Sequence, residues 1–284
     1  MKLDRTNIKS FMKVDGDDGS MRPVTTMDIK NLLESTRINI KTQLSRYNFK
    51  ESSVNDLDDL LMESGGQPLR SSIISTWRSG TTFLGELLNA VPGTFYHYKP
   101  LLSYGITQIR SAPQADGALS TIKGMFKCNF HGRDGYFEFG KTHAFQFSHN
   151  TRLWDHCINK KELCADAEFT SKMCTLFPFQ IMKLVRLRLE LVKEILEDSD
   201  LNVKVVLLIR DPRAVMQSRK HRYFCTTSPE CWQPELLCAD MISDYVASFL
   251  NHNKQTLLHT LYTDADKHLY THVHRHLAIR YIFS

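Results

Sequence analysis

Hydrophobic and polar positions divide the chain into two unequal parts near residue 70. In the first part, apolar side chains recur at helical spacing within Thr25–Asn48, which predicts an amphipathic helix. Ser52–Gln67 is acidic and contains Gly65-Gly66 near its end, a pattern typical of a linker. We therefore expect residues 1–70 to form a stem-like amino-terminal segment and residues 71–284 to form the main domain.

Beyond residue 70, short apolar segments alternate with helical patterns. Strands are predicted at Ser72–Thr76, Phe179–Val185 and Asn202–Ile209, and helices at Phe83–Val91, at Leu187–Asp198 and from Pro212 to about Arg222. This alternation predicts an α/β fold with a central parallel sheet flanked by helices. Ligands of such sheets bind beyond the carboxyl ends of the strands.

Residues 111–175 interrupt this alternation. They are rich in Gly, Phe, His and Cys and show no clear period. We expect an insertion of short helices over the binding face, where aromatic and histidine side chains of residues 101–175 could contact a second ligand.

Composition and charge narrow the class of protein. The chain has 284 residues, of which 42% are hydrophobic and 24% charged, as in ordinary globular proteins. A formal net charge of +5 suits an anionic ligand but is too small to indicate nucleic-acid binding. No stretch reaches the apolar length of a membrane span, and the first residues are too polar for a signal peptide, so we expect neither in this sequence.

The cysteines point to an oxidising compartment. Their spacings suit local disulfides such as Cys157–Cys164 and Cys225–Cys231, with one cysteine left over, although buried free thiols would also account for them. No CxxC pair occurs, so a zinc site is not expected. The seven cysteines are Cys128, Cys157, Cys164, Cys174, Cys225, Cys231 and Cys238.

The first candidate motif lies between the strand near residue 74 and the helix that follows it, in the sequence STWRSGTTF. Gly80 allows a sharp turn, so that successive amides point to one anion at a helix amino terminus. Thr81 and Thr82 add hydroxyls, and Arg78 adds a planar cation. The motif is not Walker A, which requires GxxxxGK[ST]. The alternative is an ordinary turn with a helix cap.

The second candidate motif follows the third predicted strand. Arg210 ends that strand, and Ser218 lies eight residues later in the next helix. Both side chains could face one crevice and hold a second phosphate. The alternative is a basic helix exposed to solvent.

Together, RSGTT and RDPRAVMQS resemble the carbohydrate sulfotransferase family, especially the Golgi 6-O-sulfotransferases of GlcNAc and galactose. The resemblance runs from about residue 71 to residue 248 and implies the P-loop sulfotransferase fold. It also implies the sulfate donor PAPS, a glycan acceptor, no metal and a place in the Golgi lumen. Carried over, the 5′-phosphosulfate site comprises Arg78, Ser79, Gly80, Thr81, Thr82 and Phe83, and the 3′-phosphate site comprises Arg210 and Ser218.

The chain departs from this family at the expected general base. The family places a glutamate in a Glu-Pro pair, whereas this chain has Lys99-Pro100. A protonated lysine cannot accept a proton, although a lowered pKa would restore basicity. His97 is an alternative base, and Glu86 fits a structural carboxylate better. We hypothesise that the chain binds PAPS but transfers sulfate poorly.

The carboxyl end also departs from the family pattern. His272–His276 alternates at strand spacing and fits an exposed polar segment better than a metal site. Arg280-Tyr281 matches part of a family strand, after which the sequence stops, so we expect a truncated carboxyl end. The alternatives to an active sulfotransferase are therefore a PAPS-binding pseudoenzyme or inactive fragment and, with less support, a P-loop kinase or NTPase.

Overall fold

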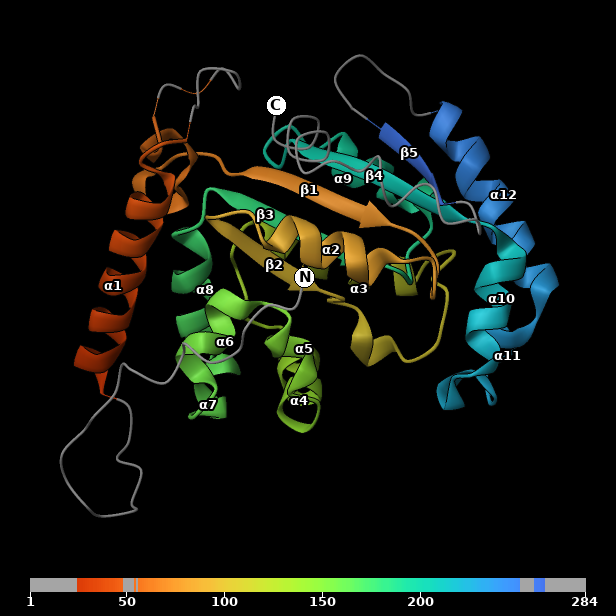
Figure 1. Cartoon of the computed structure of the whole chain (residues 1–284), viewed down its shortest axis with the longest axis horizontal. Helices are drawn as coiled ribbons and strands as arrows, with labels where there is room; N and C mark the ends of the chain where they lie inside the picture. Colours follow the sequence, from red (N-terminus) through yellow and green to blue (C-terminus); the bar gives the residue numbers. More distant parts are fainter. Residues whose placement is uncertain (1–24, 48–53, 55, 251–257, 264–284) are drawn as a thin grey trace, which may run out of the picture.

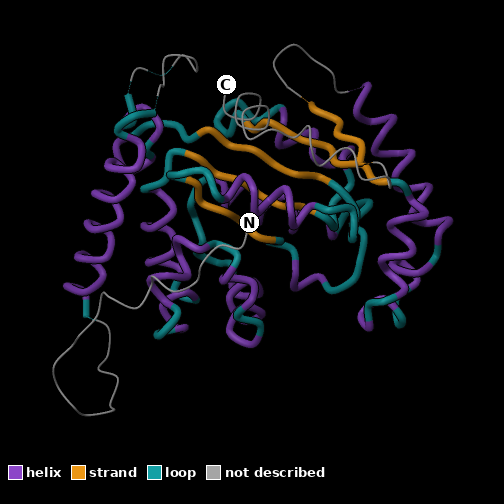
Figure 2. Tube along the Cα trace, in the orientation of Figure 1, coloured by secondary structure: helices purple, strands orange, loops and turns teal. Residues whose placement is uncertain are grey.

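The computed structural model describes residues 25–47, 54, 56–250 and 258–263. Its described part is built on a five-stranded sheet in the order β2-β3-β1-β4-β5, in which every pair is parallel (Figure 1). The strands run side by side in one layer (Figure 2). They are β1 Leu69–Ile74, β2 Thr94–Tyr98, β3 Phe179–Leu184, β4 Val203–Arg210 and β5 Leu258–Thr263.

The strand order creates a crevice between β1 and β4. The chain leaves β1 for β2 and β3 on one side and then crosses to β4 and β5 on the other. Neighbouring strands whose connections run in opposite directions open a gap at their carboxyl ends, which is where ligands of such sheets bind. Both sequence motifs lie at this gap, because one follows β1 and the other follows β4.

Helices surround the sheet. α2 (Thr81–Asn89) packs on β2 and β3, while α10 (Pro212–Lys220), α11 (Pro229–Trp232) and α12 (Pro234–Leu250) gather near the end of β4 (Figure 1). The other helices are α1 Thr26–Leu44, α3 Gln114–Phe126, α4 Asp134–Thr142, α5 Phe145–Ser148, α6 Thr151–Cys157, α7 Lys161–Cys164, α8 Ala167–Thr175 and α9 Lys193–Leu196. Short 3-10 turns are η2 Asp58–Leu60, η3 Met62–Ser64, η4 Leu102–Tyr104, η5 Leu189–Val192 and η6 Tyr223–Cys225.

The α/β prediction is confirmed, with two corrections to individual elements. Residues 187–198 form the 3-10 turn η5 and the short helix α9 rather than one helix. Asp244 of α12 accepts a hydrogen bond from the Leu189 amide at 2.8 Å, which holds the start of this segment in a turn. β2 was not predicted, because Thr94–Tyr98 is aromatic and short.

The insertion predicted at residues 111–175 does consist of short helices. Aromatic side chains of this segment pack on β2, as Phe130 does against Phe95 and His97. No described residue of the insertion lines the cavity at the carboxyl ends of the strands, although His149 stacks on Tyr98 next to it. The insertion therefore supports the β2 side of the sheet, and its role as a cover over the binding face remains a prediction.

The amino-terminal helix α1 packs against the main body. Ile40 and Leu44 belong to the hydrophobic core, and Thr36 Oγ1 lies 2.9 Å from His156 Nε2 of α6. A division of the chain at residue 70 remains a prediction. Among the described residues, no helix is both long and apolar enough to cross a membrane. The segments His272–His276 and Arg280-Tyr281 lie outside the described residues.

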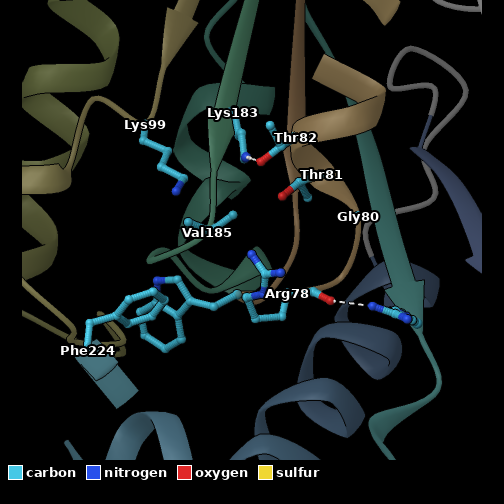
Figure 3. Close-up of a pocket in the computed structure, with 10 residues that line it drawn as sticks. Arg78, Gly80, Thr81, Thr82, Lys99, Lys183, Val185 and Phe224 are labelled. Carbon is cyan, nitrogen blue, oxygen red and sulfur yellow. Dashed lines mark hydrogen bonds between the residues drawn. The ribbon is translucent and has the colours of Figure 1, made fainter. Parts of the chain in front are cut away.

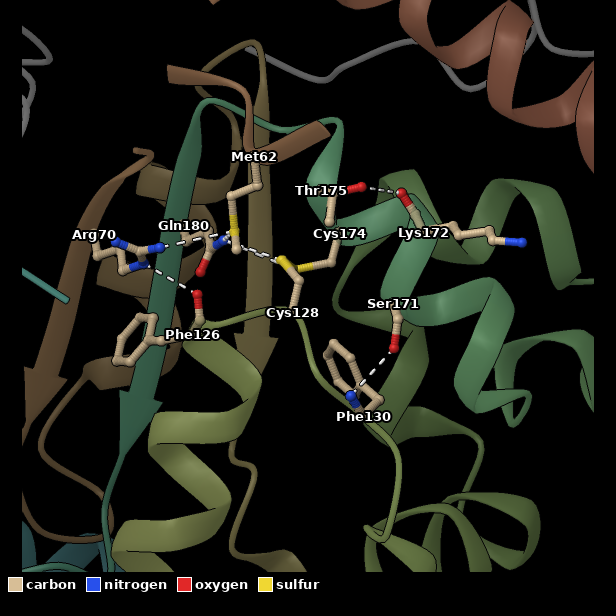
Figure 4. The surroundings of a disulfide bond; sticks show 10 residues. All are labelled: Met62, Arg70, Phe126, Cys128, Phe130, Ser171, Lys172, Cys174, Thr175 and Gln180. Atoms are coloured by element: carbon tan, nitrogen blue, oxygen red, sulfur yellow. Dashed lines mark hydrogen bonds between the residues drawn. A yellow bond between two sulfur atoms is a disulfide. The ribbon is translucent and has the colours of Figure 1, made fainter. Parts of the chain in front are cut away.

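Three disulfides join cysteines of the described part. Cys157–Cys164 and Cys225–Cys231 confirm the predicted local pairs, and Cys238 is the cysteine left over. The third pair, Cys128–Cys174, links the residues after α3 to α8 beside Gln180 of β3 (Figure 4).

Candidate functional site

A cavity of about 250 Å³ opens at the carboxyl ends of β1, β3 and β4 (Figure 3). Its walls carry basic, hydroxyl and aromatic side chains. The lining residues are Trp77, Arg78, Gly80, Thr81, Thr82, Lys99, Lys183, Val185, Arg210 and Phe224. None of these ten side chains is acidic, so the cavity suits an anionic ligand.

The turn between β1 and α2 shapes one side of this cavity. Gly80 precedes the first residue of α2 with φ +97°, and a Cβ there would meet no atom within 4 Å. Arg78 also has a positive φ, +72°. α2 begins beside the cavity without a side-chain cap, at the end of the helix where the dipole favours negative charge.

Two residues of the first motif face elsewhere. The Ser79 side chain is buried, and its hydroxyl donates to the Thr76 carbonyl at 2.8 Å. Ser79 therefore holds the turn together instead of lining the cavity. The Phe83 side chain is 54% exposed on α2 and is likewise absent from the cavity wall. Arg78, Gly80, Thr81 and Thr82 do line the cavity.

The second motif meets the first directly. Arg78 Nε donates to Ser218 Oγ at 3.0 Å, and an Arg210 guanidinium N–H donates to the Arg78 carbonyl at 2.9 Å. These contacts join residues 140 and 132 positions apart in the sequence. The predicted halves of one anion site are thus in contact across the crevice between β1 and β4.

Two lysines enter the cavity from the β2 side of the sheet. Lys183 of β3 donates from Nζ to Thr82 Oγ1 at 2.5 Å. Its Nζ lies 4.9 Å from the centre of the Tyr98 ring, and Lys99 Nζ lies 5.0 Å from the same centre. Two amines, one from β3 and one from the residue that follows β2, therefore lie near the ring of one buried phenol.

Burial and neighbouring cations weaken the basicity expected of these lysines. Burial lowers the pKa of Lys99 to about 8, with help from Arg186 and Arg78. Burial lowers the pKa of Lys183 to about 6, and the positive charges of Lys99, Arg78 and Arg186 act in the same direction, against Glu86. The pKa of Arg78 is lowered as well, first by burial and then by Arg222 and Arg210. Such a cluster favours an anion that neutralises it.

His97 does not enter this cavity. Its ring packs against its β2 neighbour Phe95 and against Phe126 and Phe130, and it is 3% exposed. Burial lowers the pKa of its imidazole to about 3. A ring held in the core cannot reach an acceptor hydroxyl, so we do not retain His97 as a base.

Glu86 pairs with a histidine of the insertion. Its Oε1 lies 2.5 Å from His149 Nδ1, and the His149 ring stacks on Tyr98 with centroids 3.7 Å apart. Glu86 thus supports the ring over which the two lysines sit. This agrees with its interpretation as a structural carboxylate.

Lys183, Val185 and Phe224 are the cavity residues that neither the motifs nor the family resemblance indicated. Lys183 could have been noticed, because lysine is rarely found in a buried parallel strand unless it has a partner. Phe224 gave no such signal. It enters the wall from η6, next to the disulfide Cys225–Cys231, and stands at the other end of the cavity from Lys183 (Figure 3).

Comparison of the sequence with known proteins agrees with a cavity that suits an anionic ligand. Residues 70–279 match the model of the sulfotransferase domain. The chain belongs to the sulfotransferase family. The match includes β1 from its second residue on, both motifs and Lys183, and the resemblance to carbohydrate sulfotransferases is confirmed. It does not favour a kinase or NTPase.

The curated relatives are carbohydrate sulfotransferases. The chain is 30% identical over 183 residues to carbohydrate sulfotransferase 4 of Mus musculus, covering 56% of this chain and 46% of that protein. It is 29% identical over 168 residues to carbohydrate sulfotransferase 6 of Homo sapiens, covering 52% and 42%. It is 31% identical over 183 residues to carbohydrate sulfotransferase 7 of Rattus norvegicus, covering 51% and 37%. The match thus spans less than half of each relative, and no solved structure matches the chain.

Proposed function

We propose that this chain transfers a sulfuryl group from PAPS to a hydroxyl of a glycan. The observation that carries the proposal is the contact between the two motifs, in which Arg78 meets both Ser218 and Arg210 at the edge of a cationic cavity. Two phosphate-binding segments at one crevice suit a donor with a phosphosulfate at one end and a second phosphate at the other.

The residues present fit such a donor. The amides at the start of α2 and the hydroxyls of Thr81 and Thr82 would hold the 5′-phosphosulfate, next to Arg78. Arg210 and Ser218 would hold the 3′-phosphate. Gly80 leaves open space where any side chain would intrude on the ligand.

The chemistry needs alignment and charge stabilisation more than covalent participation by the protein. PAPS supplies an activated sulfuryl group on a phosphate leaving group. Arg78 and the α2 amides would stabilise the negative charge that grows on the transferred oxygens, from positions fixed before the reaction. No carboxylate lines the cavity wall, so the acceptor proton would leave to water or to a basic group such as the neutral form of Lys99.

We further propose the 6-hydroxyl of GlcNAc or galactose as the acceptor and the Golgi lumen as the location. The support is the resemblance of the two motifs to enzymes of that kind and the names of the relatives, which act on carbohydrates. The three disulfides fit an oxidising lumen.

A transfer assay with radiolabelled PAPS and desulfated keratan or chitobiose tests the proposal. We expect incorporation of sulfate, and we expect Arg78→Ala and Arg210→Ala each to lower kcat/KM by about 100-fold, the usual cost of removing a charge-stabilising donor. Arg213→Ala is the matched control, because Arg213 lies on the same basic helix but its side chain is 89% exposed and pairs with Asp211. ATP with Mg²⁺ replaces PAPS in a parallel series.

Three outcomes would contradict the proposal. Binding of ATP–Mg²⁺ in preference to PAPS would favour a nucleotide kinase. PAPS binding without transfer to any glycan would favour a pseudoenzyme. Equal losses in Arg213→Ala and Arg210→Ala would show that the two arginines act only through net charge.

A further inference from the structure

His149 and Glu86 form a hydrogen-bonded pair where the insertion meets α2. His149 follows α5, and its Nδ1 lies 2.5 Å from Glu86 Oε1. The imidazole also stacks on the Tyr98 ring, with centroids 3.7 Å apart, and the His149 carbonyl accepts a hydrogen bond from Asn89 Nδ2 at 2.9 Å. Contacts with both α2 and β2 therefore hold the imidazole in one place.

The pair lies close to the turn between β1 and α2. Glu86 is four residues after Thr82 in α2, so the two side chains project from the same face of the helix, one turn apart. The Tyr98 ring, on which His149 stacks, has the Lys99 amine 5.0 Å from its centre, and both Thr82 and Lys99 line the cavity. The imidazole is thus next to the cavity without being part of its wall.

The hydrogen bond to Glu86 leaves the second ring nitrogen of His149 available. A carboxylate only accepts hydrogen bonds, so Nδ1 carries the proton of the neutral ring and Nε2 carries the lone pair. Among the described residues, none is hydrogen-bonded to His149 Nε2. The His149 side chain is 27% exposed, whereas His97 is buried, so a ligand at the mouth of the cavity can reach His149.

The imidazole of His149 is neutral near pH 7, as a proton acceptor must be. Burial lowers its pKa below the ordinary 6.5, against the hydrogen bond and the charge of Glu86, and the charges of Lys183 and Lys99 lower it further. The phenol of Tyr98, the remaining titratable group in contact with the ring, has a raised pKa because it is buried and therefore keeps its proton.

The other basic groups near this part of the cavity are less suited to accept a proton. Lys99 has a pKa of about 8 and is mostly protonated at pH 7. Lys183, with a pKa of about 6, is mostly neutral, but it is 1% exposed and its Nζ donates to Thr82 Oγ1. None of the residues that line the cavity is acidic.

We propose that His149 is the general base of the transfer reaction and that Glu86 is the residue that positions it. This inference rests on the proposed function and concerns the acceptor. The acceptor hydroxyl gives its proton to Nε2 while its oxygen forms a bond to sulfur, and the bond between sulfur and the bridging oxygen of PAPS breaks. The electron pair of that bond stays on the 5′-phosphate. Glu86 stabilises the imidazolium, which then releases the proton to solvent.

The pH dependence of kcat distinguishes this base from Lys99. The base must be deprotonated, so kcat should be constant around neutral pH and should fall about tenfold per pH unit below the pKa of His149, on the acid side of 6.5. The full chain is assayed with saturating radiolabelled PAPS and desulfated keratan from about pH 5 to about pH 9. A decline that begins near pH 8 would indicate Lys99 and would overturn the assignment.

Substitutions of the pair separate a catalytic role from a structural one. His149→Gln keeps an N–H that can donate to Glu86, so it should lower kcat about 100-fold and abolish the acid decline, with PAP affinity and acceptor KM within about threefold. Imidazole added to His149→Ala should restore part of the lost rate. Glu86→Gln removes the charge that favours the imidazolium, so it should lower kcat and move the acid decline to lower pH.

His131→Gln is the matched control. His131 belongs to the same insertion and also pairs with a glutamate, Glu168 at 3.2 Å, but its side chain is 59% exposed and it does not line the cavity. This variant should leave kcat and its pH dependence unchanged.

Three results would be decisive. If His149→Gln keeps the kcat and the acid decline of the parent, this inference fails while the proposed function stands. Loss of stability and of PAP binding in His149→Gln, with no rescue of His149→Ala by imidazole, would show that the pair is structural and would also overturn the inference. If the parent transfers no sulfate from PAPS, the proposed function itself fails.

Discussion

Lys99 and Lys183 both lie near the Tyr98 ring, where the charge of Lys99 adds to burial in lowering the pKa of Lys183. The arrangement is electrostatically unfavourable without a ligand, since like charges within a few ångströms raise the free energy of the charged state. Residues retained at such a cost commonly serve a ligand rather than the fold. The cost itself can be measured in the ligand-free protein.

The stability of the ligand-free chain should rise with pH. The unfolded state holds the Lys183 proton up to a pKa of 10.5, while the folded state releases it at about 6. Between these values the unfolded state binds more protons, so the free energy of unfolding increases as pH rises. From pH 6.5 to 8.5 this group should contribute about 2 kcal/mol.

Urea denaturation of the parent and of Lys183→Met at the two pH values checks this prediction. The free energy of unfolding of the variant should change less with pH than that of the parent, and it should be larger than that of the parent at pH 6.5. A pH dependence that is the same in both proteins would show that Lys183 is charged in the folded state.

A second residue-scale prediction concerns the charge at position 99. Lys99→Glu places a carboxylate among Lys183, Arg78 and Arg186, where it could accept the acceptor proton. We expect turnover to rise at least about tenfold, since a positioned base contributes about 10²–10⁴. Lys99→Gln, which removes the positive charge without supplying a base, is the control in the same sulfate-transfer assay. A glutamate variant no faster than the glutamine variant would refute a base at this position.

At the scale of elements, the packing of α2 on β2 positions both Tyr98 and the turn between β1 and α2. Gly85 makes this close packing possible, because a Cβ there would collide with the Tyr96 hydroxyl. Tyr96 is 1% exposed and cannot easily move aside. The helix that presents Thr81 and Thr82 therefore depends on a glycine one turn further along.

Gly85→Ala should lower the free energy of unfolding by about 1–3 kcal/mol, the usual cost of overpacking. Gly135→Ala is the matched control, since Gly135 also lies in a helix, α4, and its added Cβ would meet nothing within 4 Å. It should stabilise the chain by about 0.5–1 kcal/mol, because alanine has the higher helix propensity. Thermal or urea denaturation of both variants distinguishes the cases, and a stable Gly85→Ala would mean that α2 can shift on β2.

Much of this level of organisation could be predicted from the sequence. The strands at Ser72–Thr76, Phe179–Val185 and Asn202–Ile209 were predicted within three residues of their observed ends, because continuous apolar segments identify buried parallel strands. β2 escaped prediction because aromatic residues and a histidine give no distinct period. The segment at 187–198 was misjudged because a contact with distant Asp244 decides its form.

The site was predictable to the extent that it is local in sequence. Arg78 and Gly80 lie in one short motif, and the role of Arg210 follows from its place at the end of a strand. The position of Lys183 beside Thr82 depends on which strands become neighbours, and no local pattern encodes that order. The sequence also did not indicate that the Ser79 side chain lies inside the turn. Its hydroxyl donates to the backbone carbonyl of Thr76, a contact that depends on the conformation of the turn.

At the scale of the whole molecule, the disulfide Cys128–Cys174 joins the chain just after α3 to the last turn of α8, so that helices α4–α7 lie within the loop it closes. It closes a loop with a sequence separation of 46 residues. Such a loop restricts the unfolded chain by about 4 kcal/mol in the chain-entropy model. The β2 side of the sheet, which the insertion supports, should therefore depend on this bond.

Replacement of both Cys128 and Cys174 by serine should lower the free energy of unfolding by about 2–4 kcal/mol. Cys238→Ser is the control, because Cys238 is the cysteine without a disulfide partner in the described part, and it should change stability by no more than about 0.5 kcal/mol. Urea denaturation without reductant measures both. If the double variant and the control had the same midpoint, the disulfide would add nothing to the folded state.

The small ring closed by Cys225–Cys231 offers a way to redesign the cavity wall. Phe224 enters the cavity immediately before this ring, and Arg219 anchors the ring by donating to the carbonyls of Glu230 and Cys231 at 3.3 and 3.2 Å. Both acceptors are backbone groups, so a transplanted loop of equal length would present them if it kept the two cysteines and Glu230, whose carboxylate accepts from Arg110. The segment from Phe224 to Cys231 can thus be exchanged with that of a relative as one unit, while the sequences of the five strands and of both motifs stay unchanged.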